Sequence, residues 1–154
     1  MKKKLTIILL AVALCITSIF SVDMKVNAEE IGEDVAYESL LTEDALIGDM
    51  EMQTWGVYLS SGKSIINDAG GGKIGAGGTT TAAKRCTVSV NAIVERKVSG
   101  SWVRVTSWTV TNTNSLLACA SKSISVARGY YYRVRCVHSA STDTSSSCTG
   151  ALWM

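Results

Sequence analysis

The side chains best suited to chemistry gather in one short stretch near the end of the chain, residues 128–138. This stretch holds three of the five tyrosines, three of the fifteen Lys and Arg residues, one cysteine and the only histidine. Its alternating pattern predicts a half-buried β-strand. The face expected to point inward carries Tyr130, Tyr132, Val134, Cys136 and His138. The opposite face, which we expect to be an exposed aromatic and cationic stripe, carries Tyr131, Arg133, Arg135 and Val137.

Nucleophilic catalysis would depend on His138, because it is the only imidazole in the chain. Its candidate partners are Asp143 and the serines of residues 139–147, and no Gly-x-Ser-x-Gly motif is present. Paired-carboxylate hydrolysis would have to use the scattered acids Asp68, Glu95 and Asp143. We therefore expect no catalytic residue and no enzyme activity, with His138 at a strand end in contact with water.

Several short sequence motifs resemble nucleotide-binding sites but lack the spacing or the following helix that such sites require. Between Gly56 and the Gly-Lys-Ser that begins at Gly62 there is one residue too many for a phosphate-binding loop. Gly70, Gly72 and Gly75 have the dinucleotide spacing, but no helix follows to hold a pyrophosphate. An RNA-binding sheet motif that would start at residue 128 departs from its pattern at Tyr131 and Arg133, which stand at its small and aliphatic positions. No nucleotide cofactor and no nucleic-acid partner is expected.

The first residues predict export. Lys2, Lys3 and Lys4 precede an apolar run over residues 5–22, and the stretch ending at Ala28 has the small-residue pattern of a cleavage site. We predict a signal peptide over residues 1–28, with an uncleaved anchor as the alternative. No later segment is apolar enough to span a bilayer, so we expect a secreted, extracellular mature protein with one domain. Its oligomeric state is left open.

Four cysteines follow the predicted cleavage site, and an even number in an exported chain indicates two disulfides. Cys86 and Cys136 are expected to face inward on long strands, which favours a bridge between them and leaves Cys119 with Cys148. The sequence alone permits all three connectivities. No pair has the Cys-x-x-Cys spacing typical of a metal site, so no metal is expected.

The charge is divided along the chain. Residues 29–51 contain nine acids and no base, a net charge of −9. Residues 52–154 contain eleven bases and three acids, a net charge of +8. Like-charge blocks are usually solvated, so the acidic segment is expected to be flexible and disordered. The alternative is that it folds back on the basic domain as a detachable pro-segment or charge mask.

From residue 52 to residue 154 the pattern predicts an all-β domain. β-Forming runs alternate with turn residues, and no helical period appears. The strands are expected at residues 55–59, 65–66, 86–97, 102–110, 116–126, 130–138 and 148–153. Glycine-rich residues 68–81 and serine-rich residues 139–147 are expected to be loops, with turns at 99–100 and 111–114. Six or seven short strands predict an antiparallel β-sandwich.

Residues 126–134, with a glycine turn before a tyrosine and an alternating strand, resemble the corner of fibronectin type III and immunoglobulin-like sandwiches. The resemblance implies that Tyr132 is a corner tyrosine whose hydroxyl bonds back to the preceding loop. The wider pattern also includes Gly56, the glycine-rich stretch and the Gly-Ser-Trp hairpin. It resembles a family of small secreted proteins of Gram-positive bacteria classed as a domain of unknown function. That resemblance implies no particular activity.

The choice of aromatic residues points to binding. No phenylalanine follows residue 28, whereas tryptophan and tyrosine, which join flat apolar area to a hydrogen-bonding group, are frequent. With the basic domain, this favours a non-enzymatic binding module for an anionic or glycan-bearing surface, such as a cell-surface glycan or anionic polymer. Tyr131, Arg133 and Arg135 are the candidate binding residues. The alternative is a secreted antibacterial or membrane-active protein.

Overall fold

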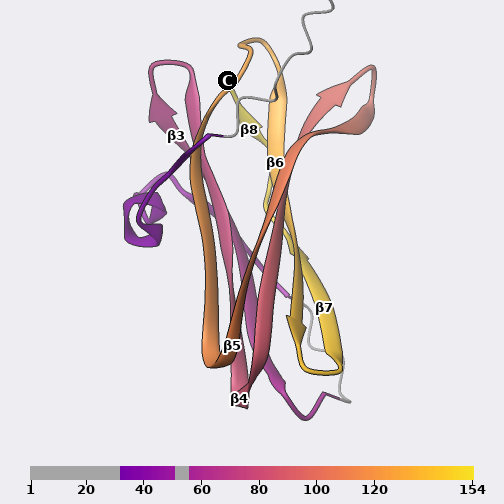
Figure 1. Ribbon diagram of the computed structural model, residues 1–154. Coiled ribbons are helices and arrows are strands. Elements are labelled where there is room, and N and C mark those ends of the chain that lie inside the picture. Colours follow the sequence, from indigo (N-terminus) through magenta and orange to yellow (C-terminus); the bar gives the residue numbers. More distant parts are fainter. Residues whose placement is uncertain (1–31, 51–55) are drawn as a thin grey trace, which may run out of the picture.

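The computed structural model describes residues 32–50 and 56–154 (Figure 1). The described residues form eight strands and one short 3-10 helix, and the predicted signal peptide lies outside them. The elements in chain order are β1 (Glu33–Asp34), η1 (Tyr37–Leu40), β2 (Leu46–Asp49), β3 (Leu59–Gly70), β4 (Lys73–Val98), β5 (Ser101–Ser125), β6 (Tyr131–Ala140), β7 (Asp143–Cys148) and β8 (Leu152–Trp153).

All strand pairs are antiparallel, and β4 and β5 are long enough to belong to two layers. The first part of β4 pairs with β3 and β5, and the second part pairs with β5 and β6. The order is β1-β5-β4-β3-β2, with β7 and β8 attached through β6. β6 packs back over the first part of β4, where Cys136 Sγ lies 3.4 Å from the Gly77 carbonyl oxygen. The expected all-β, antiparallel, sandwich-like fold is confirmed.

The core lies between these layers and follows the predicted alternation. Every second residue of β4 from Val88 to Val94 is fully buried. In β6, Tyr132, Val134 and Cys136 are buried as expected, and His138 is buried with them, whereas Tyr130, expected on the same inward face, precedes β6 and is 37% exposed. His138 is not a strand-end residue in contact with water, so that expectation is wrong. β6 continues to Ala140 and β7 pairs with it, which places His138 inside the sheet.

The predicted hairpin at residues 99–100 is confirmed. Val98 pairs with Ser101, and the two turn residues have positive φ values of 48° for Ser99 and 85° for Gly100. Positive φ at both central residues is the requirement of a two-residue type I′ turn. The turn expected at 111–114 is wrong, because β5 continues through it. Register shifts on either side of Cys86 bend the hairpin there instead.

The two loop predictions are also wrong. Residues 68–81 belong to β3 and β4 apart from a tight turn at Gly71 and Gly72. Glycine is needed within β4 for close packing, since a Cβ on Gly78 would lie 2.5 Å from Cys136 Sγ. The serine-rich stretch contains β7, whose first residue, Asp143, accepts backbone N–H bonds from Tyr58 at 2.6 Å and Leu59 at 3.0 Å.

The acidic segment is ordered over residues 32–50, so the expectation of a disordered tail is wrong for these residues. β1 pairs with β5, and β2 pairs with β3. Between them, Leu40 of η1 is buried, and the side chains of Leu40 and Asn67 together fill the space above Gly75. Lys122 Nζ lies 2.9 Å from Asp34 Oδ1. Leu40, one of the scattered apolar residues that fit no simple period, therefore packs on a sheet surface left open by glycine.

The corner tyrosine is confirmed, because the Tyr132 hydroxyl donates to the Ala127 carbonyl at 2.8 Å. We predict that Tyr132→Phe lowers the free energy of unfolding by about 1–2 kcal/mol, since the buried ring stays and a hydrogen bond is lost. Urea denaturation measures this change. Tyr131→Phe is the control, as its ring is exposed, and should change stability by less than about 0.5 kcal/mol. Equal effects in the two variants would contradict the assignment.

Candidate binding surface

Aromatic side chains form a row across four strands on the outer face of the second layer. Trp102 of β5 pairs with Lys97 of β4, and Tyr131 of β6 pairs with Trp153 of β8. The Tyr131 and Trp153 rings meet edge to face with centroids 4.8 Å apart, and Lys97 Nζ lies 5.9 Å from the Trp102 ring centroid. Tyr131 is 44% exposed and Trp153 is 57% exposed. We call Trp102, Tyr131 and Trp153 the aromatic row.

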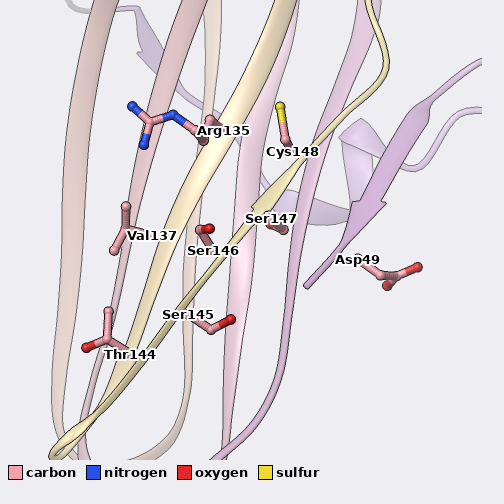
Figure 2. A pocket seen from close by; sticks show the side chains of 8 residues that line it. All are labelled: Asp49, Arg135, Val137, Thr144, Ser145, Ser146, Ser147 and Cys148. Atoms are coloured by element: carbon pink, nitrogen blue, oxygen red, sulfur yellow. The ribbon is translucent and has the colours of Figure 1, made fainter. Parts of the chain in front are cut away.

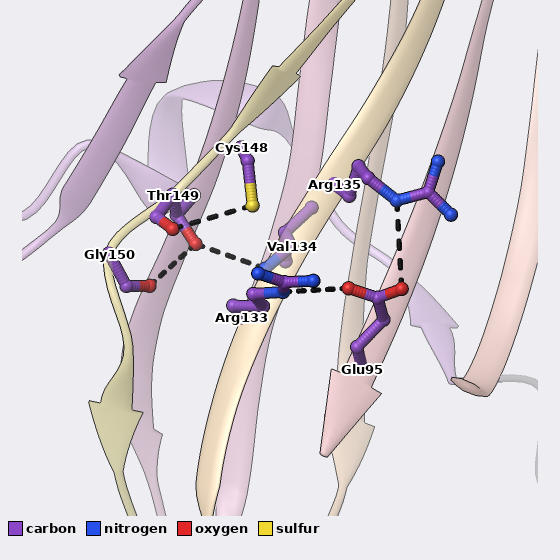
Figure 3. Close-up of polar contacts among 7 residues, drawn as sticks. All are labelled: Glu95, Arg133, Val134, Arg135, Cys148, Thr149 and Gly150. Atoms are coloured by element: carbon purple, nitrogen blue, oxygen red, sulfur yellow. Dashed lines mark hydrogen bonds and ion pairs between the residues drawn. The ribbon is translucent and has the colours of Figure 1, made fainter. Parts of the chain in front are cut away.

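Next to this row, a buried carboxylate holds two arginines (Figure 3). Glu95 of β4 accepts a hydrogen bond from Arg133 Nε at 2.7 Å, and its other oxygen lies 3.6 Å from Arg135 Nε. The Arg133 guanidinium also lies 4.3 Å from the centroid of the Trp102 ring. Stacking on an aromatic face and pairing with a carboxylate fix the guanidinium in place. We call Glu95, Arg133 and Arg135 the arginine cluster.

A groove with a volume of about 670 Å³ begins at this cluster (Figure 2). Arg135 and Val137 of β6 line one side, residues 144–148 of β7 cross it, and Asp49 of β2 lies at the other rim. Figure 2 shows the Arg135 guanidinium at one end of the groove and Thr144 at the other. The groove is thus lined mainly by hydroxyl groups, with a cation at one end.

The three residues predicted for the binding surface, Tyr131, Arg133 and Arg135, lie together on the outer face of β6. The sequence did not predict Trp102 and Trp153 as their neighbours, and it identified Glu95 only as one of three scattered acids. The hairpin turn at residues 99–100 could have revealed Trp102, because a two-residue turn fixes the pairing of Lys97 with Trp102. β8 has only two residues, so its pairing carries little sequence signal.

His138 lies inside the fold and joins three strands. Its Nδ1 is 2.8 Å from Thr80 Oγ1 of β4, and its Nε2 is 2.7 Å from Ser147 Oγ of β7. Burial lowers the pKa of His138 from 6.5 to about 4, so the ring is neutral at pH 7. Asp143, the expected partner, is bonded instead to the amides of Leu59 and Tyr58, which lower its pKa. Ser147 is buried, and this network anchors β7 to the core.

The four cysteines described are free thiols. Cys136 is the register partner of Ala92, whereas Cys86 stands six residues earlier on β4, about 20 Å away at the usual strand rise. A disulfide needs Cα atoms within about 7 Å, so the expected Cys86–Cys136 bridge is wrong. Cys119 pairs with Thr79 and Cys148 pairs with Arg135, on different strand pairs. Burial raises the pKa of Cys136 to about 12.

Two kinds of feature are absent from residues 32–50 and 56–154. No helix there has the length and apolar character needed to cross a membrane. No group of three or more His, Cys, Asp or Glu side chains is placed to hold a metal ion in the same ranges.

The fold and the surface define an all-β, sandwich-like protein with an aromatic and cationic outer face. The chain belongs to a family of unknown function, DUF6147, whose sequence profile matches residues 26–152, as the sequence resemblance predicted. No curated protein matches it. Among solved structures, it is similar to the solution structure of R. palustris CsgH, with 13% sequence identity and a TM-score of 0.36. That match covers 66% of this chain and 87% of the other.

Proposed function

We propose that this protein is an exported, non-enzymatic binding module for a glycan-bearing surface, which it contacts with the aromatic row and the arginine cluster. The observation that carries the proposal is the exposure of Tyr131 and Trp153, which touch each other on a sheet face. Exposed aromatic rings beside cationic groups are typical of surfaces that bind a ligand. Export is proposed from the charged and apolar start of the chain.

The chemistry of the row suits a sugar. One face of a sugar ring presents C–H groups, and its edge presents hydroxyl groups. A flat aromatic ring covers the C–H face and excludes water from it, while Lys97 and the arginines supply hydrogen-bond donors at the edge. The same face would therefore contact both parts of a sugar.

The row is also held rigidly before any ligand arrives. The residues that carry the three rings are in paired strands, and the type I′ turn fixes the register between β4 and β5. Tyr131 is packed against Trp153, and Trp102 against Arg133. Preorganised side chains lose little conformational entropy on binding, which raises affinity.

A membrane-active protein would need its glycine-rich stretch to rearrange at a bilayer. Gly75, Gly77 and Gly78 are buried in paired positions of β4, so the structure gives this stretch a packing role. Leakage of dye from anionic liposomes at micromolar protein would nevertheless overturn the binding proposal in favour of membrane activity.

We predict that Trp153→Ala and Tyr131→Ala each weaken binding to polysaccharides by about tenfold or more, as expected for aromatic contacts at the centre of an interface. A panel of neutral and acidic cell-wall polysaccharides, read by pull-down and then by titration calorimetry, measures this effect. Leu117→Ala is the matched control, because Leu117 is similarly exposed but lies on the first layer. Binding that both aromatic variants retain in full would contradict the proposal, as would no binding to any member of the panel.

A further inference from the structure

We infer that the groove beside Arg135 is an anion site, and that the ligand is consequently an acidic polysaccharide rather than a neutral one. This inference rests on the proposed function, since it names the class of glycan that the same face would bind. The acidic group would be a carboxylate, sulfate or phosphate on the sugar chain. These groups share the oxygen geometry that a guanidinium binds through two hydrogen bonds.

The two arginines of the cluster differ in how closely their guanidinium groups are bound by other residues of the protein. Arg133 donates to Glu95 at 2.7 Å and is stacked on Trp102. Arg135 is 3.6 Å from the same carboxylate, and its side chain is 41% exposed. Figure 3 shows its Nε directed at Glu95 and its two terminal nitrogens directed away from it. Those terminal nitrogens are therefore placed to bind a ligand.

Among the described residues, the charges of the arginine cluster do not cancel. Two guanidinium groups share one carboxylate, which leaves one positive charge. Arg104, the partner of Glu95 on the other side, adds a second cation on the same face. At the far rim of the groove, Asp49 Oδ1 lies 3.5 Å from Lys63 Nζ, so this lysine offsets the negative charge of Asp49. An anion entering beside Arg135 would meet a net positive surface.

The rest of the groove supplies hydroxyl groups and one apolar surface. Thr144 and Ser146 of β7 are exposed, and Val137 of β6 lies between them and Arg135. Hydroxyl groups can donate to an anion and can also accept from a sugar hydroxyl. A guanidinium with neighbouring hydroxyls and an apolar wall suits a sugar that carries an acidic group.

The distance between the anion site and the aromatic row sets the size of the ligand. Tyr131 and Arg135 stand four residues apart on the same face of β6, which is about 13 Å at the usual strand rise. One sugar cannot reach both. A ligand that contacts the row and the groove together must be an extended chain, so we infer a polysaccharide and not a monosaccharide or a free anion.

The test uses polymer pairs that differ only in charge: dextran with carboxymethyl-dextran, and hydroxyethyl-cellulose with carboxymethyl-cellulose. Dextran sulfate separates sulfate from carboxylate, and inorganic polyphosphate is the anion without sugar. We predict that the protein binds the acidic member of a pair about tenfold more tightly than the neutral member. The advantage should shrink when NaCl is raised from about 0.05 M to about 0.5 M, because salt screens exposed charges.

The decisive variant is Arg135→Ala. It should lose the advantage for the acidic polymer while keeping the affinity for the neutral polymer within about twofold. Lys84→Ala is the control for lost charge, because Lys84 is exposed in the first part of β4, away from the groove. Trp153→Ala should weaken binding to both members of a pair. Melting curves of each variant separate lost binding from lost folding.

The outcomes distinguish this inference from the proposed function. Equal affinity for the neutral and acidic members would overturn the anion site and leave glycan binding standing. Polyphosphate binding as tight as that of the acidic polysaccharides, unaffected by Trp153→Ala, would show simple ion exchange and overturn the inference. No binding to any of the polymers or to the wider panel would overturn both.

Discussion

The folded protein is expected to be about 3 kcal/mol less stable at pH 4 than at pH 7 as a result of His138 alone. Burial lowers the pKa of His138 from 6.5 to about 4, so the unfolded chain takes up a proton in this interval and the folded chain does not. The contribution of His138 is therefore present in full above pH 6.5 and is lost as the pH falls towards 4. Urea denaturation at a series of pH values measures it.

The interval from pH 6.5 to 5 isolates this effect, because ordinary carboxyl groups titrate lower. Asp143 titrates lower still, since the backbone N–H groups of Leu59 and Tyr58 depress its pKa. The single histidine also gives one assignable ring signal in NMR, which should titrate near pH 4 in the folded protein. Unchanged stability between pH 7 and pH 5, or a ring that titrates at its usual value, would contradict the prediction.

Replacing Leu40 by alanine is expected to lower the free energy of unfolding by about 2–4 kcal/mol. Leu40 is 2% exposed, and its Cδ2 occupies the space that a side chain on Gly75 would take. Its carbonyl also accepts a hydrogen bond from Asn67 Nδ2 at 3.2 Å, so η1 anchors the acidic segment alongside the pairing of β1 and β2. Urea denaturation gives the change, and hydrogen exchange shows whether β2 opens first.

The neighbouring residue provides the matched control. Leu41 is 54% exposed, so Leu41→Ala should change stability by less than about 0.5 kcal/mol. If both variants were as stable as the unaltered protein, residues 32–50 would be dispensable for folding, as a detachable pro-segment would be. If both were destabilised equally, the loss would not be specific to the buried contact of Leu40, and the prediction would be wrong.

The sequence predicted the parts of the fold that depend on local pattern. The alternation in residues 130–138 predicted which side chains of β6 are buried, because each strand residue points to the face opposite its neighbour. Ser99 and Gly100 predicted the hairpin because few residue pairs adopt two positive φ values readily. The resemblance to a sandwich corner identified the hydrogen bond of Tyr132 in advance.

The failures share a physical cause, which is that the deciding partner lies far away in the chain. Gly78 lies in a stretch whose composition is typical of a loop, and only its close contact with Cys136 in the folded chain explains why glycine is needed there. Leu40 belongs by sequence to an acidic segment that predicts a disordered tail, and only the space left by Gly75 in the folded chain explains its burial. The candidate binding surface shows the same cause. The alternation on β6 predicted the exposed stripe of Tyr131, Arg133 and Arg135, but Trp153 joins the stripe only through the two-residue pairing of β8 with β6.

The length of β4 and β5 has a consequence for how the molecule folds. Both strands pass from one layer to the other, so the two layers share a backbone and are not separable units. The tight turn at Ser99 and Gly100 lets the hydrogen bonds between β4 and β5 form first between residues close together in sequence and then extend outward. Each step closes only a short loop, so the loss of chain entropy is small. Once formed, this hairpin couples the face that carries the aromatic row to the opposite layer, where the acidic segment is packed. We therefore expect loss of either layer to unfold the other, and the protein to unfold as one cooperative unit.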